Sequence, residues 1–304
     1  SSCKAKMGQF FYSCLLVTFC VLLAQGQRIA VKKCTEYQAV STAEYFATGP
    51  KPVSLQSGCL KSENDRPVPG EFPHQVLLGW PKLDDPDQYD LQCGGALISD
   101  RYVLTAAHCL NREPPAIVRL GEFSIRQKDV EQVDVPVEST VVHPEYSASA
   151  VYNDIALIKL SEPVTFSLVV QPACLWTEDE LNMTVITAGF GLYDILEGDV
   201  IDLSRKEPLD VLNTKLCEEQ YANLAKFPRG IIDSQLCLGG NQRKADVCLT
   251  DSGAPVQVQT SPTTSCTYHV VGIVSTLVCD AVESPSVYTR VASYVDWIEA
   301  IVWG

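Results

Sequence analysis

Three residues of this chain have side chains that together could carry out nucleophilic acyl transfer. His108 lies in the run LTAAHC, Asp154 in NDIAL and Ser252 in CLTDSGAP. A serine hydroxyl needs a base to take its proton, and the base needs a carboxylate that holds it in the right tautomer. Taken singly, each residue has an ordinary alternative: a core histidine, an aspartate at the start of a strand, and a serine in a turn.

The elements that would position these residues are short apolar segments, many of them β-branched, separated by turns. Strands of this length predict an all-β fold of antiparallel sandwiches or barrels. The predicted strands are Gln75–Leu78, Ala96–Ile98, Val103–Ala106, Ile117–Leu120, Val133–Val137, Ile155–Leu160, Val185–Ala188, Val270–Ser275 and Ser286–Val291.

One segment at the end of the chain departs from this pattern. Between Tyr294 and Val302, apolar residues occupy positions 294, 295, 298, 301 and 302. This spacing places them on one stripe of a helix, so the segment predicts a C-terminal amphipathic helix.

The three motifs, in the order His, Asp, Ser, resemble those of the trypsin and chymotrypsin family of serine proteases. Further matches are CGGALI at 93–98, GFG at 189–191, PSVYTRV at 285–291 and the Trp297–Ile298 helix. The likeness runs from about Glu71 to the C-terminus. It implies two antiparallel six-stranded β-barrels over residues 67–304, with the active site between them and an α-helix at the end.

The resemblance assigns a role to individual residues. His108, Asp154 and Ser252 would form the catalytic triad, and the backbone N–H groups of Thr250 and Ser252 would form the oxyanion hole. Asp246 lies six residues before Ser252, where trypsin-like members keep the carboxylate that pairs with a substrate Arg or Lys. The alternative is an ordinary loop aspartate.

The resemblance also implies disulfides. Cys93–Cys109, Cys217–Cys237 and Cys248–Cys279 carry over directly. Cys174 resembles the cysteine that tethers the pro-segment, with Cys59 as its natural partner, which leaves Cys34 for Cys266. The alternative for this last pair is two free or intermolecular thiols.

Three residues depart from the family pattern near the predicted site. Thr250 replaces a glycine whose N–H donates to the oxyanion, and a β-branched residue adopts that backbone geometry poorly. Leu277 and Ser286 replace glycines on the walls of the specificity pocket. The alternatives are that neighbouring residues hold the Thr250 donor in place, and that Leu277 turns outward and reshapes specificity.

The activation sequence departs as well. In the family a new Ile-Val-Gly-Gly N-terminus pairs with the aspartate before the nucleophile, here Asp251. No such sequence is present around Lys61–Asn64. Cleavage after Lys61 would expose a serine, and Arg66 is followed by proline. Because a buried unpaired charge is costly, Asp251 would then either find another partner or leave the pocket disordered.

The N-terminal part of the chain indicates export. Met7 is followed by an apolar run from Phe10 to Ala24 that is too short to span a bilayer comfortably, and Ala24-Gln25-Gly26 fits a signal-peptidase site. We expect a cleaved signal peptide over residues 1–26, in which those before Met7 are not native; a retained signal anchor is the alternative. Residues 27–66 would be a pro-segment and linker, and the Pro-rich and polar stretch 51–73 indicates an extended chain.

Net charge and cysteine content limit the kinds of partner that the protein can have. The formal net charge is −14, which disfavours nucleic acids and anionic membranes. Ten cysteines follow residue 26, an even number that predicts disulfides in an exported protein, and no CxxC spacing suggests a metal. No cofactor is expected. The sequon at Asn182 predicts glycosylation, unless it is unused.

Two functions remain open. One is an active endopeptidase that cleaves after Arg or Lys; the other, which the departures favour, is a protease homologue that binds a substrate or partner protein with weak or no turnover. The segments KCTEY at 33–37 and EFPH at 71–74 are similar to those of secreted insect haemolymph proteases of the snake and easter group. That likeness implies an extracellular proteolytic cascade of immunity or development.

Overall fold

The computed structural model describes residues 27–48, 67–124, 132–189, 205–239, 252–260, 267–276 and 285–304. The predicted signal peptide, residues 1–26, and most of the predicted linker lie outside these ranges. Glu71, Phe72 and Pro73, the last residues of the stretch 51–73 that was expected to be extended, are buried in the domain. The Glu71 carboxylate accepts the Val68 N–H and pairs with Lys206.

The first barrel is closed and antiparallel, with strand order β1-β2-β3-β6-β5-β4. In it Leu104 of one strand pairs with Leu157 of the next. Its strands are β1 (Gln75–Pro81), β2 (Tyr89–Leu97), β3 (Tyr102–Thr105), β4 (Ile117–Leu120), β5 (Val133–Val142) and β6 (Ala156–Leu160).

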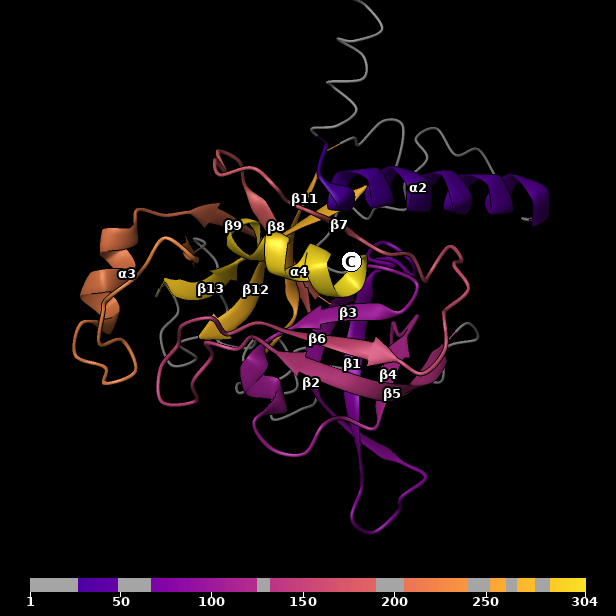
Figure 1. Cartoon of the computed structure of the whole chain (residues 1–304), viewed down its shortest axis with the longest axis horizontal. Coiled ribbons are helices and arrows are strands. Elements are labelled where there is room, and N and C mark those ends of the chain that lie inside the picture. The colour runs from indigo at the N-terminus through magenta and orange to yellow at the C-terminus, as the bar shows by residue number, and fades with distance from the viewer. Residues whose placement is uncertain are drawn as a thin grey trace, which may run out of the picture.

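The second barrel has the order β11-β8-β9-β10-β13-β12, and a β11–β12 pairing closes it. A short strand, β7, runs parallel to β12 as an additional member. The strands are β7 (Cys174–Leu175), β8 (Val185–Gly189), β9 (Arg205–Val211), β10 (Gln235–Gly239), β11 (Pro255–Gln259), β12 (Tyr268–Thr276) and β13 (Ser286–Arg290). The predicted pair of six-stranded barrels is therefore confirmed (Figure 1).

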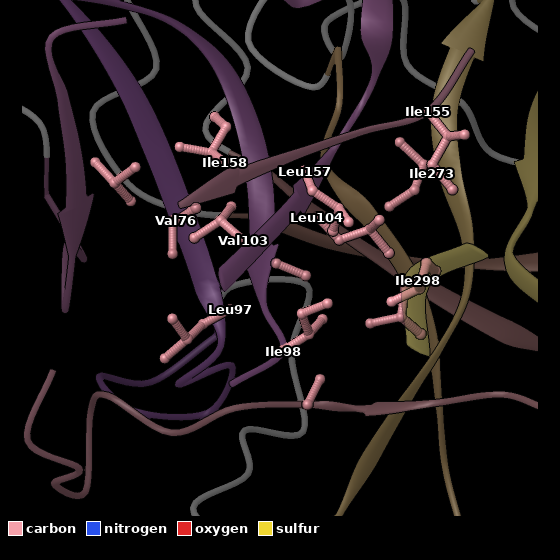
Figure 2. Packing of buried hydrophobic residues seen from close by; sticks show 14 of the residues in the cluster. Val76, Leu97, Ile98, Val103, Leu104, Ile155, Leu157, Ile158, Ile273 and Ile298 are labelled. Carbon is pink, nitrogen blue, oxygen red and sulfur yellow. The ribbon is translucent and has the colours of Figure 1, made fainter. Parts of the chain in front are cut away.

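The barrels share a core that explains why they form one unit. Leu104 and Leu157 of the first barrel, Ile273 of the second and Ile298 of the C-terminal helix are all fully buried in one apolar cluster. Figure 2 shows Ile273 and Ile298 beside Ile155 and Leu157. Burial of this shared surface opposes separation of the barrels and so holds the cleft between them in shape.

Three α-helices lie outside the barrels in the described ranges. The predicted C-terminal helix is α4 (Val295–Val302), and α3 (Thr214–Tyr221) begins where the Asn213 side chain accepts the Lys215 N–H. The third is α2 (Ile29–Thr48), which sequence reasoning missed because its apolar residues do not gather on one face. None of these described helices is long and apolar enough to cross a membrane.

The position of α2 corrects two predicted disulfides. α2 lies against β7 and α4 (Figure 1), and Cys34 bonds to Cys174 with a Cα–Cα distance of 5.1 Å. Cys34 therefore does not pair with Cys266, and Cys174 does not pair with Cys59; Cys59 and Cys266 lie outside the described residues. Cys34 reaches Cys174 because the start of α2 is docked on α4, where the Ala30 N–H donates to the Glu299 carboxylate at 2.8 Å.

Candidate active site

The ends of two neighbouring strands bring His108 and Asp154 together. β3 and β6 are antiparallel partners, with Thr105 opposite Ala156. The end of β3 therefore meets the start of β6. His108 follows β3 in the 3-10 helix η1 (Ala107–Leu110), and Asp154 precedes β6.

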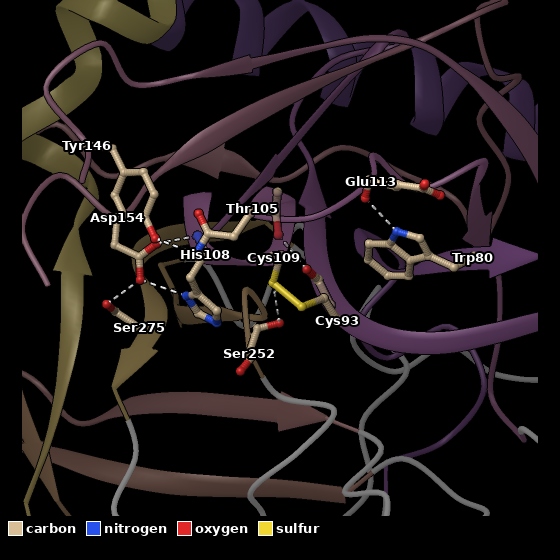
Figure 3. Close-up of a disulfide and its surroundings, with 12 residues drawn as sticks. Trp80, Cys93, Thr105, His108, Cys109, Glu113, Tyr146, Asp154, Ser252 and Ser275 are labelled. Atoms are coloured by element: carbon tan, nitrogen blue, oxygen red, sulfur yellow. Dashed lines mark hydrogen bonds and ion pairs between the residues drawn. A yellow bond between two sulfur atoms is a disulfide. The ribbon is translucent and has the colours of Figure 1, made fainter. Parts of the chain in front are cut away.

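The Asp154 carboxylate is buried, with 3% of the residue exposed, and it receives three hydrogen bonds. Nδ1 of His108 lies 2.7 Å from Oδ2, the His108 backbone N–H donates to Oδ1 at 2.8 Å, and the Ser275 hydroxyl donates to Oδ2 at 2.6 Å (Figure 3). In addition, the Thr289 hydroxyl donates to the Asp154 carbonyl at 2.8 Å. Because the carboxylate accepts at Nδ1, this nitrogen carries the proton and Nε2 is left as the acceptor.

Ser252 is held between the barrels by its backbone. Its carbonyl accepts the Gly94 N–H at 2.8 Å, and the following Gly253 N–H donates to the Val274 carbonyl at 3.0 Å. Ser252 lines the same cleft as His108 and Asp154, and Figure 3 shows its side chain on the imidazole side of His108. The three predicted catalytic residues are therefore brought to one place.

Gly253 is required by this arrangement. Its φ is +78°, and a Cβ there would lie 2.4 Å from Thr105 Oγ1 and 2.7 Å from the Gly94 carbonyl oxygen. A larger residue would have to push Ser252 away from its position.

Two predicted disulfides are present. Cys93–Cys109 joins β2 to η1 directly beside His108, and Cys217–Cys237 joins α3 to β10. The predicted partners Cys248 and Cys279 lie outside the described residues. The Cys93–Cys109 bond therefore fixes η1, and with it the His108 main chain.

The cleft around these residues has a volume of about 1090 Å³. Its lining includes Trp80, Leu83, Glu113, Tyr146 and Val151, and Figure 3 shows Trp80 and Glu113 on one side of His108 and Tyr146 on the other. Burial raises the pKa of Tyr146, so its phenol stays neutral over the physiological range.

Several predicted site residues fall beyond what the structure describes. Thr250, Asp251, Asp246 and Leu277 all lie outside the described ranges, so their roles stay predictions. Ser286 is described and fully buried in β13, and it is not among the described residues that line the cleft.

Sequence reasoning missed the role of Ser275. This residue lies in β12 of the second barrel, 121 positions from Asp154 in the chain. No local pattern marks it, because an ordinary strand serine and a carboxylate-binding serine look alike in sequence. The one available signal was its position directly after the buried residues of β12 and next to the predicted pocket.

Three comparisons with known proteins agree with the fold. The trypsin family model matches residues 62–298. The serine protease snk of Drosophila melanogaster is 40% identical over 294 residues, which are 91% of this chain and 66% of that protein. The phenoloxidase-activating factor 3 of Holotrichia diomphalia is 36% identical over 250 residues, covering 76% of this chain and 69% of that protein.

A solved structure shows the same architecture. The Drosophila Grass clip serine protease of the Toll pathway matches with a TM-score of 0.64 and 28% identity, over 81% of this chain and 75% of that one. The chain spans 66% of snk and only 42% of the Drosophila serine protease Hayan. On the match to the family model and these relatives, the chain belongs to the trypsin family of serine proteases.

Proposed function

We propose that this protein is a secreted serine endopeptidase of the trypsin type whose turnover is slow, so that it acts in an extracellular protease cascade partly or wholly by binding. The observation that carries the proposal is the buried Asp154 carboxylate, which orients His108 through Nδ1 at 2.7 Å. This is the arrangement that general-base catalysis by Nε2 requires.

In the proposed reaction, His108 Nε2 takes the proton of the Ser252 hydroxyl as the oxygen attacks the substrate carbonyl carbon. The tetrahedral intermediate collapses when His108 returns this proton to the leaving amine, and a water molecule then releases the acyl group by the same steps. Asp154 remains ionised throughout and stabilises the imidazolium. Its contacts with Ser275 and the His108 main chain support that role.

The slow turnover is proposed from Thr250. A glycine at this position would let the peptide point its N–H at the oxyanion without backbone strain. Loss of one oxyanion donor typically lowers turnover by roughly 10²–10³-fold. Leu277 would add a side chain to the wall of the specificity pocket, which would lower the affinity for long basic side chains.

The second candidate is an endopeptidase of full activity that cleaves after Arg or Lys. The complete set of contacts at Asp154 favours it, and Asp246 would supply the carboxylate at the base of the pocket. The two candidates share substrate class and compartment; they differ in the rate of turnover and in whether the protein acts mainly by binding or by cleavage.

Two observations support the proposed role in an extracellular protease cascade: the names of the relatives and the predicted signal peptide. Names such as Spaetzle-processing enzyme and phenoloxidase-activating factor 3 describe proteins that act on other proteins. A signal peptide over residues 1–26 would export the chain, and Asn182, whose side chain is exposed, would be glycosylated in the secretory pathway. A mass decrease on treatment with an N-glycosidase, absent in Asn182→Gln, tests the modification.

The deciding experiment uses residues 27–304, treated with an activating protease and reacted with a fluorophosphonate. Ser252→Ala is the control for labelling, and Thr250→Gly is the matched variant at the oxyanion hole. We expect slow labelling of the parent protein and roughly 10²-fold faster hydrolysis of an arginine ester by Thr250→Gly.

Fast hydrolysis by the parent, unchanged in Thr250→Gly, would favour the fully active endopeptidase. If the parent, Thr250→Gly and Ser252→Ala all show neither labelling nor ester hydrolysis, the protein is a binding homologue only. The N-terminal sequence of the activated chain would show which bond replaces the family's usual activation site, and so which group is available to pair with Asp251.

A further inference from the structure

We infer that Tyr152 is a positioning residue for catalysis, because it fastens the segment that leads to Asp154 onto the second barrel. This segment, residues 143–154, lies between β5 and β6 and is named the Asp154 segment. The inference rests on the proposed function, since it concerns how the catalytic carboxylate is held. Tyr152 is 5% exposed and is not among the described residues that line the cleft, so it acts through Asp154 and not on the substrate.

The Tyr152 hydroxyl bonds to the main chain of the loop between α3 and β10, residues 222–234. It accepts the Arg229 N–H at 2.8 Å and donates to the Gly230 carbonyl at 2.9 Å. A phenol can both donate and accept, and here it does so with two consecutive residues. One hydroxyl therefore fixes the Asp154 segment on this loop through two directional bonds.

The ring of Tyr152 is held as well. The guanidinium of Arg229 lies over it, 4.1 Å from the ring centroid, which is an attractive arrangement of a cation and an aromatic ring. The ring also belongs to a buried apolar cluster that includes Tyr221 and the Cys217–Cys237 disulfide. Because the ring is packed in this way, few alternative positions are open to the hydroxyl.

The residue before Tyr152 is bound to the same loop. The Val151 N–H donates to the Lys226 carbonyl at 3.2 Å. The Val151 carbonyl accepts the side-chain amide of Gln235 at 3.1 Å, and the amide oxygen of Gln235 accepts the Ile232 N–H at 3.2 Å. The Asp154 segment is thus joined to the second barrel through two neighbouring residues, and Tyr152 supplies the bonds that lie nearer to Asp154.

The residue after Tyr152 has an unfavourable backbone conformation. Asn153 has a φ of +54° and is the one non-glycine residue with a positive φ among the described residues. Its Oδ1 accepts the Tyr294 hydroxyl at 2.9 Å, and its Nδ2 donates to the Glu145 carbonyl at 3.2 Å. Such a conformation persists only where the surrounding structure enforces it. Asn153 therefore depends on contacts on both sides, those of its own side chain and those of Tyr152.

This turn sets the direction in which the Asp154 carboxylate leaves the main chain. Without the two bonds of the Tyr152 hydroxyl, the backbone at Asn153 could relax, and the carboxylate would meet Nδ1 of His108 in a poorer geometry. Small displacements of catalytic groups are costly for the rate. The bonds that Asp154 receives from Ser275 and from the His108 main chain would remain, so the loss is partial.

The test compares two variants of residues 27–304 in which a tyrosine loses only its hydroxyl. Tyr152→Phe keeps the ring in the apolar cluster. Tyr221→Phe is the matched control, because Tyr221 lies in the same cluster and is 1% exposed. Its hydroxyl donates to the Pro285 carbonyl at 3.0 Å, and this bond does not involve the Asp154 segment.

Two readouts are measured on each variant. The first is the rate at which a fluorophosphonate labels Ser252. The second is the proton NMR resonance of the His108 Nδ1–H, which lies far downfield because the proton is in a short hydrogen bond to a carboxylate. It is assigned by its absence in His108→Gln. The resonance reports the geometry between His108 and Asp154 directly and does not depend on turnover.

We expect Tyr152→Phe to be labelled about tenfold more slowly than the parent and its resonance to move upfield, whereas Tyr221→Phe leaves both unchanged. An unchanged resonance, an unchanged rate where the parent is labelled, or equal changes in Tyr221→Phe would overturn the inference. If the parent is not labelled at all, the proposed catalysis fails, and the resonance alone then decides whether Tyr152 positions Asp154.

Discussion

His108 and His74 each lie next to a strand of the first barrel, yet they occupy opposite kinds of environment. His108 keeps 28% of its side chain exposed, and its partner is a carboxylate at 2.7 Å. His74 is 1% exposed, and its Nε2 lies 3.1 Å from the amide oxygen of Gln257. Both are hydrogen-bonded histidines, yet only the first has a second nitrogen that faces a cleft.

The difference shows what turns a histidine into a candidate base. Burial lowers the pKa of His74 to about 4, so it stays neutral and packs against Phe72 and Tyr268. His108 has a carboxylate partner at Nδ1, which leaves Nε2 as an acceptor on the side of the cleft. Both residues have the same side chain, so the hydrogen-bond partner and the access to the cleft decide which histidine can act as a base.

The largest expected effect comes from removing the carboxylate beside His108. In Asp154→Asn, Nδ1 no longer has an anionic acceptor, so the tautomer with the proton on Nε2 is no longer excluded. We expect ester hydrolysis by the activated protein to fall about 10⁴-fold, measured in the Thr250→Gly background where the rate is higher. A fall of less than tenfold, with normal thermal unfolding, would show that Asp154 does not orient His108.

The second effect concerns the backbone that presents Ser252 to His108. Gly253→Ala would place a Cβ 2.4 Å from Thr105 Oγ1 at a φ of +78°, which we expect to lower the free energy of unfolding by about 3 kcal/mol. Gly230→Ala is the matched control, because its φ is +66° and nothing lies within 4 Å, and it should cost only about 1 kcal/mol. Equal losses of the two variants in urea unfolding would refute the role of close packing at Gly253.

The third effect is the pH dependence that His74 gives to stability. Histidine in the unfolded chain binds a proton near pH 6.5, whereas folded His74 does so only near pH 4. Its contribution to stability is thus present above pH 6.5 and is lost as pH falls toward 4. The full change is about 3 kcal/mol, and about 2 kcal/mol of it falls between pH 6.5 and 5.

His74→Gln tests this, because glutamine can hydrogen-bond but does not titrate in this range. Urea unfolding at pH 7 and pH 5 should show a loss of stability that is about 2 kcal/mol smaller in the variant than in the parent. The same pH dependence in both proteins would mean that other groups account for the acid sensitivity.

Much of the fold was predictable because its signals are local. Nine strands and the C-terminal helix follow from short β-branched runs and from one helical stripe, which neighbouring residues specify. β9 was missed, since its sequence RKEPLDV is mostly polar and contains a proline. The short strands β7, β10 and β11 also escaped, because buried runs of this length do not separate strand from loop.

The family, the two barrels and the residues His108, Asp154 and Ser252 could be identified from the sequence, because their motifs are local and ordered along the chain. Tertiary structure decided which groups meet across long separations. It paired Cys34 with Cys174 through the docked α2, brought Ser275 to Asp154 and enclosed His74 while leaving His108 open to the cleft. Such contacts depend on the packing of whole elements, which no local pattern records.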